Sequence, residues 1–277
     1  MVDNRAVIAE ALGGKRIAVT GATGFLGTAI VERLLRSVPG CELVLLVRAG
    51  KRSTAANRVQ REILKNDAFD RLRRELAGGG ETFEAMAARR IQVIAGDVGA
   101  DGLGLSEVDR ATFASCDVVI HSAATVSFDS PLDSAVEVNL LGPTRIVTLL
   151  NALGVTPHLV AVSTCYVAGN RRGSAPEALV SEGPFDLGIN WRTEVDAARR
   201  TRADEEARSR TPERLTHYRS EARHELGAAG TPALAAKTEQ LRVRAVADRW
   251  SRRAALVPHR SAGPTRTPTR RRSASRR

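Results

Sequence analysis

The 277-residue chain contains only three cysteines, Cys41, Cys116 and Cys165, and no run of about 18 apolar residues that could cross a membrane. An odd number of widely spaced cysteines argues against a disulfide framework and fits a reducing compartment, so we expect each to be a small buried hydrophobe. The opening segment, MVDNRAVIAEAL, also lacks the apolar core of a secretory signal. These absences predict a cytoplasmic protein without a transmembrane segment.

Acidic residues are absent from residues 251–277, which hold nine of the 42 Lys and Arg residues. The remaining 33 basic side chains face 31 acidic ones in residues 1–250, so most of the formal net charge of +11 belongs to the end of the chain. A basic folded surface would favour an anionic partner, but this charge distribution does not indicate one. Because residues 251–277 also lack aromatic side chains for base stacking, we expect no specific nucleic-acid binding.

Between residues 15 and 163, apolar runs alternate with longer segments of helical periodicity. This alternation is typical of βαβ units, and strands rich in Val, Ile and Leu indicate a sheet covered on both faces. The sequence therefore predicts an α/β fold, with a Rossmann-like doubly wound parallel sheet in residues 1–173. We expect strands at 16–20, 42–47, 90–97, 117–124 and 158–164, and helices at 25–38, 54–76 and 131–153.

Residues 174–250 differ in composition, and from residue 191 they are rich in Arg, Glu and Ala with apolar residues at helical spacing. We expect a helical insertion of two or three helices, with Pro212 and Pro232 near helix starts, because proline is tolerated in the first turn. Residues 251–277 cannot bury a core and are expected to form a disordered, Arg-rich tail.

The segment TGATGFLG, residues 20–27, follows the first expected strand and opens the first expected helix. In this context Gly21 permits a tight turn, Gly24 lets the backbone approach a pyrophosphate, and Gly27 lets the helix pack on the sheet. The free N–H groups of the helix N-terminus favour phosphate. The alternative is a tight turn without a ligand. The motif predicts a dinucleotide site whose first loop contains Gly21, Thr23, Gly24, Phe25, Leu26 and Gly27.

The end of the second expected strand reads VRAGKR, so Arg48 stands where an acidic residue would bind the ribose of NAD, with Lys51 and Arg52 close behind. A guanidinium suits a 2′-phosphate through charge-assisted hydrogen bonds. Arg48 therefore favours NADPH as the cofactor. The alternative interpretation is a solvated basic turn.

Four segments together resemble a known family: TGATGFLG, GDV at 96–98, HSAATVSFD at 121–129 and VSTCYVAG at 162–169. They are similar to the extended short-chain dehydrogenase/reductases. Within that superfamily they look most like the fatty acyl-CoA reductases with a male-sterility type NADPH-binding domain, which are relatives of thioester reductase domains. The resemblance covers roughly residues 10–250.

The resemblance implies further site residues and no metal. Asp97 and Val98 would flank the adenine, while Ala123, Ala124 and Thr125 would line the nicotinamide side of the cofactor. Asn139 would support the proton relay, and the hydroxyl of Thr164, with Ser163 beside it, would polarise the substrate carbonyl. Two alternatives stay open: Asp97 could simply cap a turn, and Asn139 could be a satisfied buried amide.

The proton donor that such reductases use is missing. They place a Tyr four residues before a Lys, so that the Tyr protonates the oxyanion formed by hydride transfer. The two tyrosines here, Tyr166 and Tyr218, are followed at that spacing by Asn170 and Ala222. We therefore expect a cofactor site without its acid.

The composition of residues 260–277 has an explanation at the level of codons. If the reading frame is shifted so that each new codon starts at the third base of the old one, the codons allow an amino-acid sequence that contains GWPDAYxYTKALGE. This sequence resembles the missing family segment and restores Tyr-x-x-x-Lys. We expect that the reading frame changes shortly after Trp250 and that the chain is C-terminally truncated. The alternative is a genuine basic arm.

Together these features predict an NADPH-dependent reductase of long-chain fatty acyl-CoA to aldehyde or alcohol, inactive in this form. The helical insertion after Thr164 favours this function over the main alternative, an extended-type epimerase or dehydratase acting on a nucleotide sugar. A non-catalytic NADP-binding remnant is the third interpretation. Peripheral membrane contact and the oligomeric state stay open.

Overall fold

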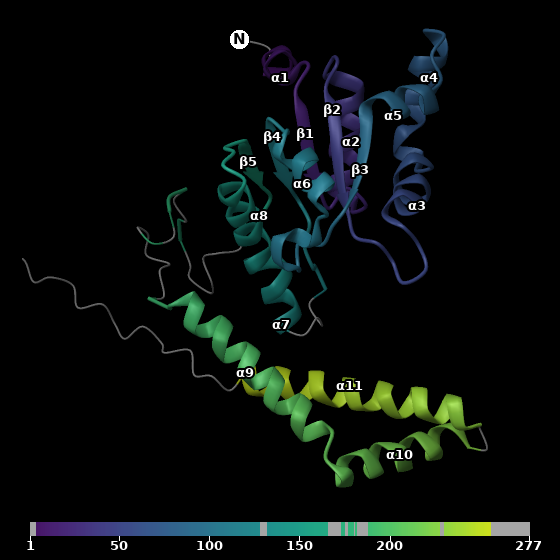
Figure 1. The fold of residues 1–277 in the computed structure, drawn as a ribbon, viewed down its shortest axis with the longest axis vertical. Helices are drawn as coiled ribbons and strands as arrows, with labels where there is room; N and C mark the ends of the chain where they lie inside the picture. The colour runs from purple at the N-terminus through teal and green to yellow at the C-terminus, as the bar shows by residue number, and fades with distance from the viewer. Residues whose placement is uncertain are drawn as a thin grey trace, which may run out of the picture. The chain divides into compact units, whose positions relative to one another are not determined.

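The computed structural model describes residues 4–127, 132–165, 188–227 and 230–255, together with 173–174, 177–179 and 181. These residues belong to two compact units, which are described separately. The first unit contains the sheet and the second contains the long helices near the end of the described chain (Figure 1).

The first unit is built on a five-stranded parallel sheet in the order β3-β2-β1-β4-β5. The chain winds outward from β1 to β3 and then returns to β4 on the other side of β1, which confirms the doubly wound α/β fold. Ligands bind such sheets at the carboxyl ends of the strands where the order reverses, here between β1 and β4. The strands are β1 (Arg16–Thr20), β2 (Glu42–Val47), β3 (Ile91–Ala95), β4 (Val118–His121) and β5 (His158–Ala161).

The helices of this unit follow the expected positions with two differences. The helix expected over 54–76 is divided, because the side chain of Asn66 accepts from the backbone of Ala68 and starts a new helix. A helix capped by the Thr82 side chain was not expected. The elements are α1 (Asn4–Leu12), α2 (Phe25–Ser37), α3 (Ala55–Val59), η1 (Gln60–Leu64), η2 (Asp67–Phe69), α4 (Asp70–Gly78), α5 (Phe83–Arg90), η3 (Asp101–Gly104), α6 (Glu107–Ala114), α7 (Leu132–Ala135), η4 (Val136–Leu140) and α8 (Leu141–Ala152).

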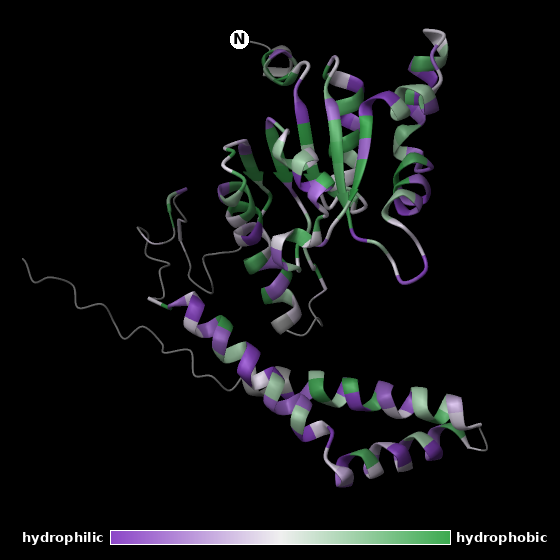
Figure 2. Ribbon diagram, viewed as in Figure 1, coloured by the Kyte–Doolittle hydropathy of each residue, from purple (hydrophilic) through white to green (hydrophobic). Residues whose placement is uncertain are grey.

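The strands are mostly hydrophobic (Figure 2), and β1, β2 and β4 are buried on both faces, as their apolar residues predict, whereas the edge strands β3 and β5 are more exposed. Successive side chains of a strand point to opposite faces. Ile17 and Val19 pack in the cluster that includes α2 and α5, whereas Ala18 packs with Val44 and Ile146 of α8 in the other. Burying both faces holds the carboxyl ends of β1 and β4 in fixed positions beside each other.

The cysteines occupy two different environments. Cys41 and Cys116 are buried, as expected, whereas Cys165 is exposed, which contradicts the expectation for that residue. The difference arises because Cys165 lies in the segment leaving β5, an edge strand on which Val160 is already 40% exposed.

The second unit contains three helices, α9 (Trp191–Ser209), α10 (Pro212–Leu226) and α11 (Thr231–Ala255). Pro212 begins α10 and Pro232 lies in the first turn of α11, as predicted. Because α11 continues to Ala255, the first five residues of the expected disordered tail are helical. The rest of that segment, 256–277, lies outside the described residues.

A small core and a buried arginine join these helices. Tyr218, Ala222 and Leu241 form the apolar cluster. The Arg242 side chain is 3% exposed and donates to the hydroxyl of Ser209 at 2.7 Å, while it pairs with Glu206 at 2.8 Å. No helix within the described part of the chain is long and apolar enough to cross a membrane.

Candidate functional site

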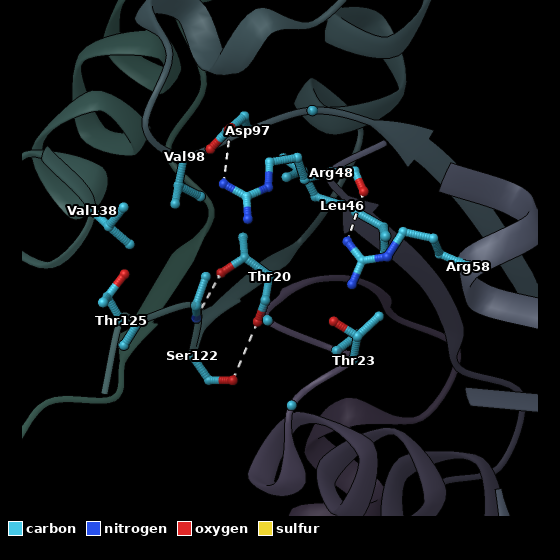
Figure 3. A pocket seen from close by; sticks show the side chains of 17 residues that line it. Thr20, Thr23, Leu46, Arg48, Arg58, Asp97, Val98, Ser122, Thr125 and Val138 are labelled. Carbon is cyan, nitrogen blue, oxygen red and sulfur yellow. Dashed lines mark hydrogen bonds and ion pairs between the residues drawn. The ribbon is translucent and has the colours of Figure 1, made fainter. Parts of the chain in front are cut away.

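A pocket lies at the carboxyl ends of β1, β2 and β4, where the strand order reverses (Figure 3). Its walls come from the loop after β1, the end of β2, the loop after β3, the segment after β4 and the π-helix η4. It brings together most of the residues that the sequence assigned to cofactor binding: Gly21, Thr23, Gly24, Arg48, Asp97, Val98, Ala123, Ala124 and Thr125.

The glycines of the first loop are required by close backbone contacts. Gly21 has φ +74°, and a Cβ there would lie 2.5 Å from the backbone nitrogen of Ala123. A Cβ on Gly27 would overlap the carbonyl oxygen of Gly21, and one on Gly24 would lie 3.2 Å from the same oxygen. The loop therefore folds tightly over the start of α2 and against the segment after β4.

The first turn of α2 supplies backbone rather than side chains. Gly24 is the N-cap, and no side chain caps the helix there. Phe25 is 97% exposed and Leu26 is 47% exposed. The described lining of the pocket includes neither of them, nor Gly27, although the sequence assigned all three to cofactor binding. The uncapped N–H groups at this end of a helix are suited to bind an anion.

Two arginines lie beside each other in the pocket lining: Arg48 follows β2, and Arg58 belongs to α3 (Figure 3). The Arg48 side chain is 68% exposed, and its Nη1 lies 3.6 Å from Oδ2 of Asp97. Arg58 donates from Nη1 to the carbonyl oxygen of Arg48 at 2.8 Å, while its Nε and Nη2 donate to the Glu62 carboxylate, which lowers the pKa of Glu62. Arg58 thus holds the backbone of Arg48 in place, and Arg48 carries the accessible positive charge. Lys51 and Arg52 are also exposed, and neither belongs to the described residues that line the pocket.

Asp97 is fixed by its own loop. The Asp97 side chain accepts from the N–H of Gly99 at 2.8 Å, and the Asp97 N–H donates to the carbonyl of Leu103 at 2.8 Å. The turn-capping alternative for Asp97 is therefore present in the structure, together with its place in the pocket wall.

A buried threonine–histidine pair supports the floor of the pocket. The Thr20 hydroxyl lies 2.7 Å from Nδ1 of His121 and accepts from the N–H of Ala123 at 3.3 Å. Ser122 donates from its hydroxyl to the carbonyl oxygen of Thr20 at 3.2 Å. Burial lowers the pKa of His121 and so favours the neutral imidazole, whose tautomer sets which partner donates in the bond to Thr20. Sequence reasoning missed Thr20, Ser122 and Arg58, because no local pattern marks hydrogen bonds between residues so far apart.

Asn139 contacts the opposite wall. Its Oδ1 accepts from the N–H of Thr125 at 2.8 Å, and its Nδ2 donates to the Thr125 carbonyl oxygen at 2.9 Å. The two bonds fix the backbone of a residue that lines the pocket. Asn139 is exposed rather than buried, so the buried-amide alternative is wrong about its environment.

Ser163 and Thr164 follow β5 and are exposed, and neither belongs to the pocket lining within the described residues. Tyr166, which comes shortly after them, lies outside the described residues. The described residues also contain no cluster of three His, Cys, Asp or Glu side chains that could hold a metal ion.

Comparison with known proteins identifies relatives of this chain. The family model described as "Male sterility protein" matches residues 19–224. A putative fatty acyl-CoA reductase of Drosophila melanogaster is 39% identical over 162 residues, covering 58% of this chain and 30% of that protein. The alcohol-forming fatty acyl-CoA reductase of Simmondsia chinensis is 34% identical over 194 residues, covering 68% of this chain and 38% of that protein. The chain thus spans about a third of the length of these relatives.

Part of this chain also matches solved structures. The terminal R domain from the myxalamid PKS-NRPS biosynthetic pathway is 32% identical with a TM-score of 0.43, and the match covers 58% of this chain and 37% of that chain.

Proposed function

Because this chain belongs to the male sterility protein family, we propose that it forms the NADPH-binding part of a reductase that acts on long-chain fatty acyl-CoA thioesters. The observation that carries the proposal is Arg48, whose guanidinium faces the pocket beside Asp97. A chain adapted to NAD would place an acidic side chain at this position.

The pocket suits a dinucleotide in its backbone as well as its charge. Because Gly21 and Gly27 have no Cβ, the loop can fold tightly. It thereby presents the N-terminus of α2 to the pocket. We assign the pyrophosphate to that helix end, from Gly24 onward, and the adenine to the wall formed by Asp97 and Val98. The nicotinamide then lies toward Ala123, Ala124 and Thr125.

Arg48 would bind the 2′-phosphate through its exposed guanidinium. Arg58 is already paired with Glu62, so its contribution is to hold the backbone of Arg48. When bound, NADPH supplies the hydride that reduces a thioester carbonyl. The hydroxyl of Thr164, with Ser163 beside it, would polarise that carbonyl, and Asn139 would orient the segment next to it.

The chain with this sequence should bind the cofactor and turn over little substrate. No Tyr precedes a Lys by four residues, so the chain lacks the pair that protonates the oxyanion in the reductases that it resembles. We propose that the frame of residues 260–277 accounts for this loss, because the shifted reading restores the family-like Tyr-x-x-x-Lys segment. In this account the Arg-rich composition results from the altered frame and has no binding role.

The function is tested by comparing this chain with a version whose frame is restored shortly after Trp250. Both are expected to bind NADPH. Only the restored version should oxidise NADPH in a manner that depends on a long-chain acyl-CoA, and both should be inactive on UDP-sugars. Turnover of a UDP-sugar, or thioester-dependent oxidation by the chain as it stands, would contradict the proposal.

A further inference from the structure

The helix beside the pocket contains an irregular turn. In the π-helix η4, the N–H of Leu141 donates to the carbonyl of Val136, five residues earlier. In an α-helix this N–H would bond to the carbonyl of Glu137. A π turn is rare and often lies at a functional site.

Arg145 of α8 donates to this turn. Its Nη1 donates to the carbonyl oxygen of Glu137 at 2.8 Å, and its Nη2 donates to the carboxylate of the same residue. The side chain of Arg145 is only 13% exposed. A planar guanidinium with several fixed donors can contact a backbone oxygen and a carboxylate at once, which a lysine ammonium does less well.

The π turn determines which side chains of η4 face the pocket. Val138 lines the pocket, and Asn139 makes both of its hydrogen bonds to the backbone of Thr125. Each residue of a helix is rotated by about 100° from its neighbour. If the turn relaxed to α-helical bonding, Val138 and Asn139 would rotate by about this angle relative to α8 and leave their positions.

The same arginine also contacts the loop on the adenine side. Its Nε donates to Oδ1 of Asp101 at 3.1 Å. Asp101 begins η3, in which Leu103 has φ 58° and is fully buried. The Leu103 carbonyl accepts from the N–H of Asp97. Arg145 therefore contacts the segments that position both Asp97 and Thr125, on opposite walls of the pocket.

We propose that Arg145 is a positioning residue, which stabilises the π turn of η4 and thereby holds Asn139 against Thr125 in the geometry needed for cofactor binding. The part of this inference that concerns the cofactor rests on the proposed function. The part that concerns the π turn depends on the hydrogen bonds alone.

The test uses the whole chain with Arg145→Met, which removes the donors and keeps most of the aliphatic length. The matched control is Arg33→Met, which makes the same change at an exposed position of α2. Two quantities are measured for each: the Kd for NADPH by fluorescence titration, and hydrogen exchange of the Thr125 amide by NMR without nucleotide.

We expect Arg145→Met to speed exchange at Thr125 by about tenfold or more and to weaken NADPH binding by about tenfold, which corresponds to the loss of hydrogen bonds from a charged donor. Amides of β1 such as Val19 should keep their protection, because a general loss of stability would expose them as well. Arg145→Lys should restore part of the protection at Thr125 and part of the affinity for NADPH, since it keeps the positive charge but not the planar guanidinium.

Equal exchange at Thr125 in Arg145→Met and Arg33→Met would overturn the proposal. If Arg145→Met does not fold, the comparison of Arg145→Lys with Arg33→Met decides in the same way. If neither the unaltered chain nor Arg33→Met binds NADPH, the proposed cofactor is wrong, while exchange at Thr125 still decides whether Arg145 holds the π turn.

Discussion

Arg48, which follows β2, and Asp97, which follows β3, lie in the pocket lining with guanidinium and carboxylate 3.6 Å apart. The pair is exposed, so it should contribute no more than about 1 kcal/mol to the free energy of unfolding. Its importance lies in where it holds the guanidinium: over the pocket, with its backbone fixed by Arg58. Substitutions of Arg48 should therefore change cofactor selection with little change in stability.

Gly27→Ala should disrupt the site and the fold around it. The added Cβ overlaps the Gly21 carbonyl, so the loop must move, and we expect a loss of several kcal/mol of stability or no soluble protein. Urea unfolding measures the effect. Gly78→Ala is the control, because nothing lies within 4 Å of a Cβ there and the position ends α4. Gly78→Ala should leave the free energy of unfolding unchanged or raise it by up to about 1 kcal/mol. Equal effects of the two substitutions would contradict the assignment of Gly27.

The buried pair of His121 and Thr20 predicts a pH dependence of stability. Burial lowers the pKa of His121 below 6.5, so the unfolded chain binds the proton more readily than the folded one. The contribution of His121 is fully present above about pH 7, falls as the pH drops through 6.5, and levels off below the folded pKa. Urea unfolding between pH 8 and pH 5 checks the slope.

His121→Asn should flatten that slope, because the amide does not titrate and can still form a hydrogen bond with Thr20. A slope identical in the two proteins would show that another group causes it.

Thiol reactivity should separate the three cysteines. Burial raises the pKa of Cys116 to about 11 and also raises the pKa of Cys41, which Arg90 only partly offsets. Thiolates are the reactive species, so at pH 8 a disulfide reagent should modify the exposed Cys165 rapidly and the other two only after unfolding. Cys165→Ser should remove the rapid phase. Rapid modification of two or more thiols in the folded chain would contradict the burial of Cys41 and Cys116.

Resequencing the gene across the codons for residues 242–277 and beyond tests the proposed change of frame. We expect a one- or two-base difference that restores Tyr-x-x-x-Lys and is followed by more open reading frame. A confirmed frame without family-like sequence in the shifted reading would contradict the explanation for the missing acid.

The sequence predicted the parts of the molecule that local patterns encode. β1 and β2 are continuous apolar runs, and the glycines of residues 20–27 mark the turn between β1 and α2. The contacts that complete the site were not predictable in this way. Thr20 and His121 are 101 positions apart, and they meet only because β1 and β4 become neighbours in the folded sheet.

The π turn of η4 was also beyond the sequence pattern. Residues 131–153 have the periodicity of one helix, and nothing local distinguishes a five-residue hydrogen bond from a four-residue one. We attribute the turn to the contact of Arg145 with Glu137, and the position of the Arg145 side chain depends in turn on Asp101, which is 44 positions away in the sequence.

Titrating the chain with NADPH and with NADH measures whether this pocket selects NADPH through Arg48. We expect NADPH to bind at least about tenfold more tightly than NADH, since the guanidinium gains a charge-assisted bond to the 2′-phosphate. Arg48→Ala should remove this preference without altering NADH binding. Equal affinities in the unaltered chain, or a preference that survives Arg48→Ala, would contradict the account.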